Sequence, residues 1–71
     1  MEYQYIIQAE MDIKSGEWYY TIWRRIKGAD IFQSWDGGAM EDHGYTFDGV
    51  ITEIMLFHDL EDEEIFAVIG A

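Results

Sequence analysis

The chain has no cysteine and no proline, and it has no lysine or arginine after residue 27. Without cysteine, disulfides and thiolate metal sites are excluded. The missing cations leave residues 28–71 with eleven carboxylates, so the whole net charge of −11 lies in this part of the chain. A field of one sign on so small a protein attracts cationic partners and repels nucleic acid and anionic lipid.

Long apolar segments are missing as well. No stretch approaches the roughly 20 apolar residues of a membrane span, and the first residues have neither the basic nor the apolar region of a signal peptide. We therefore expect a cytoplasmic protein without membrane contact. The length of 71 residues predicts a single domain, 1–71, near the lower limit for folding unaided. Three Trp, five Tyr and four Phe residues supply the core, and homodimerisation, which would extend it, stays open.

Two strands are predicted in the first third of the chain. Residues 3–12 alternate between apolar and polar side chains, which is typical of a half-buried strand. Residues 17–27 are rich in aromatic and β-branched side chains and predict a second strand. Because Lys-Ser-Gly at 14–16 is typical of a turn, the two segments are expected to pair as an antiparallel hairpin.

The remaining elements are a short strand, a helix and a last strand. Residues 31–35 predict a strand, residues 36–44 a glycine-containing loop, and residues 65–69 a fully buried strand. At 100° per residue, the apolar side chains of residues 46–60 fall within one arc, and either Thr46 or Asp48 is a suitable N-cap. This favours a helix, although Gly49 and three β-branched residues after it oppose one. The members of the arc are Phe47, Val50, Ile51, Ile54, Phe57 and His58.

The predicted fold is therefore α+β, a small antiparallel β-sheet in β-β-β-α-β order with one helix packed on one face. If residues 46–60 form a strand instead, the alternative is an all-β five-stranded small barrel.

The clustered carboxylates are the strongest candidate for a functional surface. Glu61 to Glu64 are four acids in succession, and they serve either as solubilising gatekeepers of the last strand or as contacts for a partner. In the second interpretation the acids copy the charge of a nucleic-acid backbone, which carries one charge per about 1.7 Å of duplex. The predicted contact residues are Asp36, Glu41, Asp42, Asp48, Glu53, Asp59, Glu61, Asp62, Glu63 and Glu64.

The aromatic and basic residues of the hairpin form a second candidate surface. A stacking platform for single-stranded nucleic acid is disfavoured because the net charge is strongly negative. Packing in the core and over cationic groups is the simpler interpretation. If exposed, these side chains are instead typical anchors of a protein interface. The candidates are Tyr19, Trp23, Arg25 and Trp35.

Enzymatic and metal-binding motifs are missing. The acids do not follow the spacing of a calcium loop, and Gly37-Gly38 is not a phosphate loop because no lysine follows. His58 is expected to pack in the helix arc, and the acids beside His43 favour its protonated form. We therefore expect no catalytic residue, metal or cofactor.

In size and charge, and in no specific motif, the chain resembles the short, acidic, cysteine-free proteins that phages encode against restriction or CRISPR nucleases. The resemblance implies an inhibitor that occupies the basic groove of a nucleic-acid-binding protein and does not bind nucleic acid itself. The alternative from the residues is a protein-interaction adaptor, or a homodimeric module, that uses the aromatic hairpin face.

Overall fold

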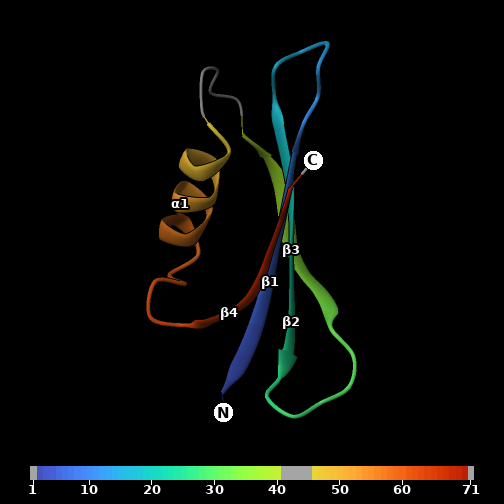
Figure 1. Ribbon diagram of the computed structural model, residues 1–71, viewed down its shortest axis with the longest axis vertical. Coiled ribbons are helices and arrows are strands. Elements are labelled where there is room, and N and C mark those ends of the chain that lie inside the picture. Colours follow the sequence, from blue (N-terminus) through green and yellow to red (C-terminus); the bar gives the residue numbers. More distant parts are fainter. Residues whose placement is uncertain (1, 41–45, 71) are drawn as a thin grey trace.

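In the described part of the chain, four strands form one open sheet in the order β3-β2-β1-β4, and a single helix lies against one side of it (Figure 1). This computed structural model describes residues 2–40 and 46–70. The predicted α+β class and the order of the elements are confirmed, and because the sheet does not close, the barrel alternative is excluded. The elements are β1 (Tyr3–Met11), β2 (Trp18–Ile26), β3 (Gln33–Met40), α1 (Phe47–Phe57) and β4 (Glu64–Gly70).

The predicted hairpin of β1 and β2 is confirmed. The two strands pair antiparallel over their full length, from Tyr3 opposite Ile26 to Met11 opposite Trp18. The turn between them is closed by the amide of Asp12, which donates to the Glu17 carbonyl at 2.8 Å. Gly16 has a φ of 76°, a conformation that glycine adopts without steric cost.

β3 is longer than predicted and includes the glycines that were expected to end it. Gly37 and Gly38 pair with Thr21 and Tyr20 of β2, so they belong to the sheet. A Cβ atom on Gly37 would lie only 2.7 Å from the carbonyl oxygen of Tyr20. The glycine therefore permits a close approach of two backbones instead of forming a turn.

Residues 47–57 form the helix, and the strand alternative for this segment is wrong. Thr46 is the N-cap, and its Oγ1 accepts a hydrogen bond of 3.1 Å from the Gly49 amide. The apolar arc buries the side chains near the middle of the helix. Phe57, the last residue of the helix, was predicted to join them but is exposed.

β4 was predicted to be a fully buried strand of an antiparallel sheet, and both expectations need correction. β4 pairs with β1 in parallel and lies at the edge of the sheet. Its direction follows from the helix, since α1 carries the chain back along the sheet before β4 begins (Figure 1). Only Ile65 and Ala67 are half-buried, and the other residues of the strand are exposed.

The core lies between α1 and the face of the sheet that the helix covers, here called the covered face. Opposite residues of paired strands share a face, so the buried pair Ile7 and Ile22 defines it. No described element lies over the other face, called the open face (Figure 1). Within the described residues, no helix has the length and apolar character needed to cross a membrane. The buried core residues are Tyr5, Ile7, Ala9, Trp18, Ile22, Val50, Ile51, Ile54 and Leu60.

Candidate functional site

The predicted acidic contact residues that the structure describes come from β3, from α1 and from the connection between α1 and β4. Asp48 lies in the first turn of α1, and Asp59 lies beyond the last turn. At 1.5 Å per residue, the 11-residue helix separates the two by about 16 Å. Glu53, between them, is half-buried. Glu41 and Asp42, together with His43, lie outside the described residues.

Five of the predicted carboxylates do lie together, in the connection between α1 and β4. We call residues 59–64 the acidic turn. All of its residues are exposed except Leu60, which is buried in the core. Its acidic members are Asp59, Glu61, Asp62, Glu63 and Glu64.

The acidic turn is held in place by the way the helix ends. Asp59 has a φ of 55°, and its amide donates to the Leu56 carbonyl at 3.4 Å. The Leu60 amide donates to the Met55 carbonyl at 2.8 Å. These two bonds and the left-handed residue are those of a Schellman motif, in which the apolar residue after the left-handed one packs back on the helix. The Glu63 amide then donates to the Leu60 carbonyl at 3.1 Å and closes a further turn.

Within the described residues, one cation forms an ion pair with the acidic turn. The Lys27 ammonium group is 3.5 Å from a Glu64 carboxylate oxygen and 3.9 Å from one of Glu2. The Gln4 side-chain amide donates to the Glu64 carboxylate, and this bond is the main reason why the pKa of Glu64 lies below its usual range. Lys27 lowers this pKa further. Glu64 is therefore the member of the turn that is tied to the sheet.

Asp36 lies outside the acidic turn and contacts His58. Its Oδ2 lies 3.4 Å from Nδ1 of His58, and the other ring nitrogen, Nε2, lies 3.0 Å from the Tyr20 hydroxyl. Burial, and then the charge of Asp36, raise the pKa of Tyr20. The predicted packing of His58 agrees with this position, but its two polar contacts, with Asp36 and Tyr20, were not predicted. No local pattern indicates them, since they come from β2 and β3.

The two arginines lie on aromatic rings. The guanidinium carbon of Arg24 is 4.4 Å from the ring centre of Tyr3 and 4.7 Å from that of Trp35. The guanidinium carbon of Arg25 is 4.4 Å from the ring centre of Phe32 and 4.9 Å from that of Phe66. This is the predicted packing of aromatic rings over cationic groups.

The aromatic candidates separate onto the two faces. Tyr19, Trp23 and Arg25 lie on the open face, opposite Glu10, Ile6 and Gln4 of β1. Trp35 lies on the covered face, with its ring centre 5.6 Å from that of Tyr5 and 5.9 Å from that of His58. An irregularity in the pairing of β2 with β3, between Ile22 and Trp23, accompanies this change of side.

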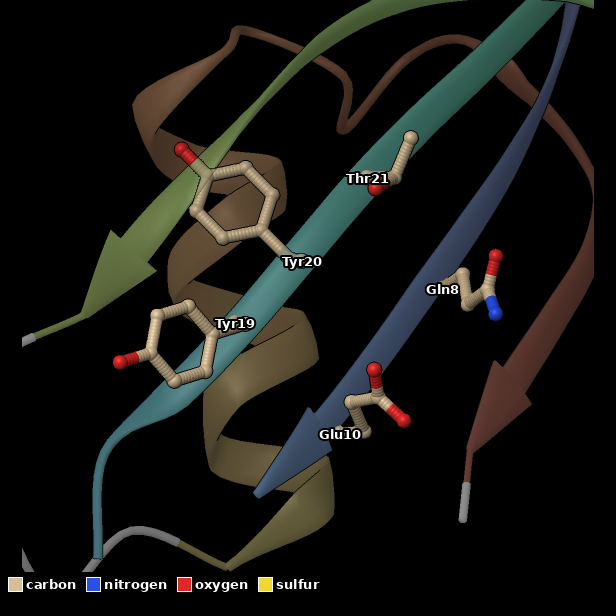
Figure 2. A pocket seen from close by; sticks show the side chains of 5 residues that line it. All are labelled: Gln8, Glu10, Tyr19, Tyr20 and Thr21. Atoms are coloured by element: carbon tan, nitrogen blue, oxygen red, sulfur yellow. The ribbon is translucent and has the colours of Figure 1, made fainter. Parts of the chain in front are cut away.

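Polar side chains cross the open face from strand to strand. Arg25 Nε donates to Oε1 of Gln4 at 2.9 Å, and Trp23 Nε1 donates to Oε1 of Gln8 at 3.3 Å. Figure 2 shows Gln8 and Glu10 on β1 beside Tyr19 and Thr21 on β2, around a shallow hollow. The open face thus presents ordered aromatic and amide groups on two neighbouring strands, β1 and β2.

Neither of two hollows in the described surface is large enough for an ordinary small-molecule ligand. The hollow in Figure 2 has a volume of about 90 Å³. A second hollow, between the start of β1, Lys27 and the acidic turn, has a volume of about 160 Å³. Pockets for small molecules usually measure about 300–1,000 Å³. In residues 2–40 and 46–70, no three acidic or histidine side chains come together in a way that would hold a metal ion.

Comparisons with family models, with curated proteins and with solved structures found no match for this chain.

Proposed function

We propose that this protein binds a basic partner protein through the acidic turn and inhibits it, without catalysing a reaction. The observation that supports this proposal most strongly is that five exposed carboxylates lie within six residues, on a backbone that is fixed by the end of α1. A loop that only solubilises the chain has no need of such order. A fixed set of charges loses less conformational entropy when a partner binds.

The spacing of the charges supports a partner that normally holds nucleic acid. Six residues span at most about 20 Å when extended, so five carboxylates give one charge per about 4 Å or less. A single nucleic-acid strand carries one charge per about 3.4 Å. Both arginines lie on aromatic rings, and Lys27 is the cation that contacts this turn in the described structure. A groove lined with lysine and arginine, as in a restriction or CRISPR nuclease, has the opposite charge and would complement the acidic turn.

The test replaces three carboxylates of the turn and compares them with a matched set. Glu61→Gln, Asp62→Asn and Glu63→Gln together remove three charges and spare Glu64, which is bonded to the sheet. The control variant carries Glu10→Gln, Glu17→Gln and Asp48→Asn. It also loses three negative charges, but these lie at the opposite end of the molecule. Each variant and the wild-type chain would be used as bait in host lysate at low and at high salt, and the captured proteins identified by mass spectrometry.

We expect the wild-type and control chains to retain a nucleic-acid-binding protein that high salt or added nucleic acid releases, because such binding is electrostatic. The acidic-turn variant should lose it. Equal retention by both variants would contradict the proposal.

The open face supports a second candidate, an interaction adaptor. Tyr19 is 43% exposed on this face, and its phenol is ordered by a bond of 3.1 Å to Glu17. Under this function, Tyr19→Ala or Trp23→Ala abolishes capture of the partner. Removal of the acidic-turn charges then has little effect, and the binding depends weakly on salt.

A further inference from the structure

Beyond the irregularity near Phe66, the outer edge of β4 lacks the charged and proline residues that usually protect an edge strand. β4 has a single neighbour, β1, so one side of its backbone is unpaired in the sheet. Native edge strands usually carry a lysine or proline, or are covered by another element. Residues 65–70 contain no charged residue and no proline. The side chains of Phe66, Val68 and Ile69 are 55%, 44% and 47% exposed.

The other edge of the sheet is different. β3 carries Asp36 near its centre, followed by two glycines, so it offers few apolar side chains to a neighbouring strand. In β4 the register shift lies near Phe66, and the residues from Ala67 to Gly70 pair regularly with β1. This regular, apolar segment is a template for one more strand.

We propose that the β4 edge pairs antiparallel with β4 of a second copy of this chain, giving a continuous eight-stranded sheet. The charges select this orientation. The acidic turn precedes β4, so an antiparallel pair places the two turns at opposite ends of strands about 20 Å long. That separation exceeds the Debye length of about 8–10 Å. A parallel pair would place the two acidic turns about 4.8 Å apart, one strand spacing.

The apolar side chains are complementary to their own copies. A pair centred on Val68 places Val68 opposite Val68 on the covered face and Ala67 opposite Ile69 on the open face. Cross-strand contacts between aliphatic side chains stabilise a sheet. The nearest like charges are Glu64 of one copy and Glu10 of the other, about 10 Å apart across two strand spacings. Salt therefore strengthens this dimer, whereas it weakens the partner binding proposed above, and the two proposals fail independently.

The test is sedimentation equilibrium of the full chain from about 5 to 500 µM, at several salt concentrations. We expect a monomer–dimer equilibrium with a dissociation constant that falls as salt is raised. Ile69→Lys places a charge on the edge and should raise this constant about tenfold or more. Ile31→Lys is the matched control, because Ile31 is 74% exposed between β2 and β3, and it should leave the constant within about twofold.

Amide hydrogen exchange locates the interface. Outward-facing amides of β4 should exchange more slowly as the protein concentration rises, in the wild-type chain and in Ile31→Lys but not in Ile69→Lys. Unchanged circular dichroism and protected β1 amides show that the variants are folded. A chain that stays monomeric at every concentration and salt overturns the proposal. So does a dimer that survives Ile69→Lys, including one lost on Trp23→Ala, which would place the interface on the open face.

Discussion

Replacement of Leu60 by alanine tests whether the acidic turn is anchored in the core. The Leu60 side chain is 1% exposed and belongs to the buried cluster between α1 and the sheet. The Schellman bonds around it are made by backbone groups, so alanine leaves them intact. The substitution therefore removes buried volume and little else. Leu→Ala changes at such positions reduce the free energy of unfolding by about 2–5 kcal/mol, which includes the cavity left behind.

For a small domain this loss is severe. At about 0.05–0.15 kcal/mol per residue, a chain of 71 residues has a free energy of unfolding of about 4–10 kcal/mol. Leu60→Ala should therefore remove a large fraction of the stability. Since about 1 kcal/mol shifts the melting temperature of such a domain by about 4–8 °C, we expect a decrease of at least about 8 °C.

Urea unfolding followed by tryptophan fluorescence measures the change, with Leu56→Ala as the control. Leu56 is 51% exposed on the same helix, so its truncation should cost no more than about 1 kcal/mol. The slope with urea should stay the same in both variants if they unfold in two states. A loss below about 1 kcal/mol for Leu60→Ala, or one equal to that of Leu56→Ala, would refute the anchoring of the turn.

Three further substitutions test local features. Gly37→Ala should lower the free energy of unfolding by about 1–3 kcal/mol in urea titrations, since the added Cβ would lie 2.7 Å from the Tyr20 carbonyl oxygen. Gly38→Ala is the control and should be tolerated, because a Cβ on Gly38 would lie 3.7 Å from the nearest atom. Asp59→Gly should raise the free energy of unfolding by about 0.5–1 kcal/mol, because the φ of 55° favours glycine; a decrease would contradict the assigned helix end. Gln4→Leu should raise the pKa of Glu64 towards its usual value, because the Gln4 bond is the main cause of the depression. The lowered pKa means that the wild-type contact stabilises the fold above pH 4.5 and is lost as the pH falls through the lowered pKa. Carboxyl NMR titration checks this shift, and an unchanged Glu64 in Gln4→Leu would contradict the bond.

The sequence predicts the elements of this fold better than their arrangement. The alternation of apolar and polar residues identifies β1, and the arc of apolar residues identifies α1. Both patterns arise because the side chains on one face of each element pack in the core. No such pattern in the sequence indicates the position of β4 in the sheet or its direction. An apolar run is typical of a central strand and of an unprotected edge strand, so the pattern at 65–69 did not distinguish between them. The glycines of β3 have the same ambiguity, because glycine serves turns and close backbone approaches alike.

The candidate surfaces show the same limit. The acids of the turn are consecutive in sequence, so their proximity was predictable, and Leu60 among them is the local sign that the segment is anchored. The link from Asp36 through His58 to Tyr20 joins β3, the end of α1 and β2, and it exists only after folding. Trp23 and Trp35 were grouped as interface candidates, yet the irregular pairing of β2 with β3 places them on opposite faces.

The two arginines explain why the acidic turn keeps most of its charge. Arg24 and Arg25 are adjacent on β2 and point to opposite faces, where each guanidinium group lies over two aromatic rings. A planar guanidinium group suits such stacking better than an ammonium group does, and stacking fixes its position on the sheet. Lys27, at the end of the same strand, contacts Glu64 and Glu2 instead. In residues 2–40 and 46–70, Glu61, Asp62 and Glu63 form no ion pair with a cation, which is the physical reason to look for a basic surface opposite this turn.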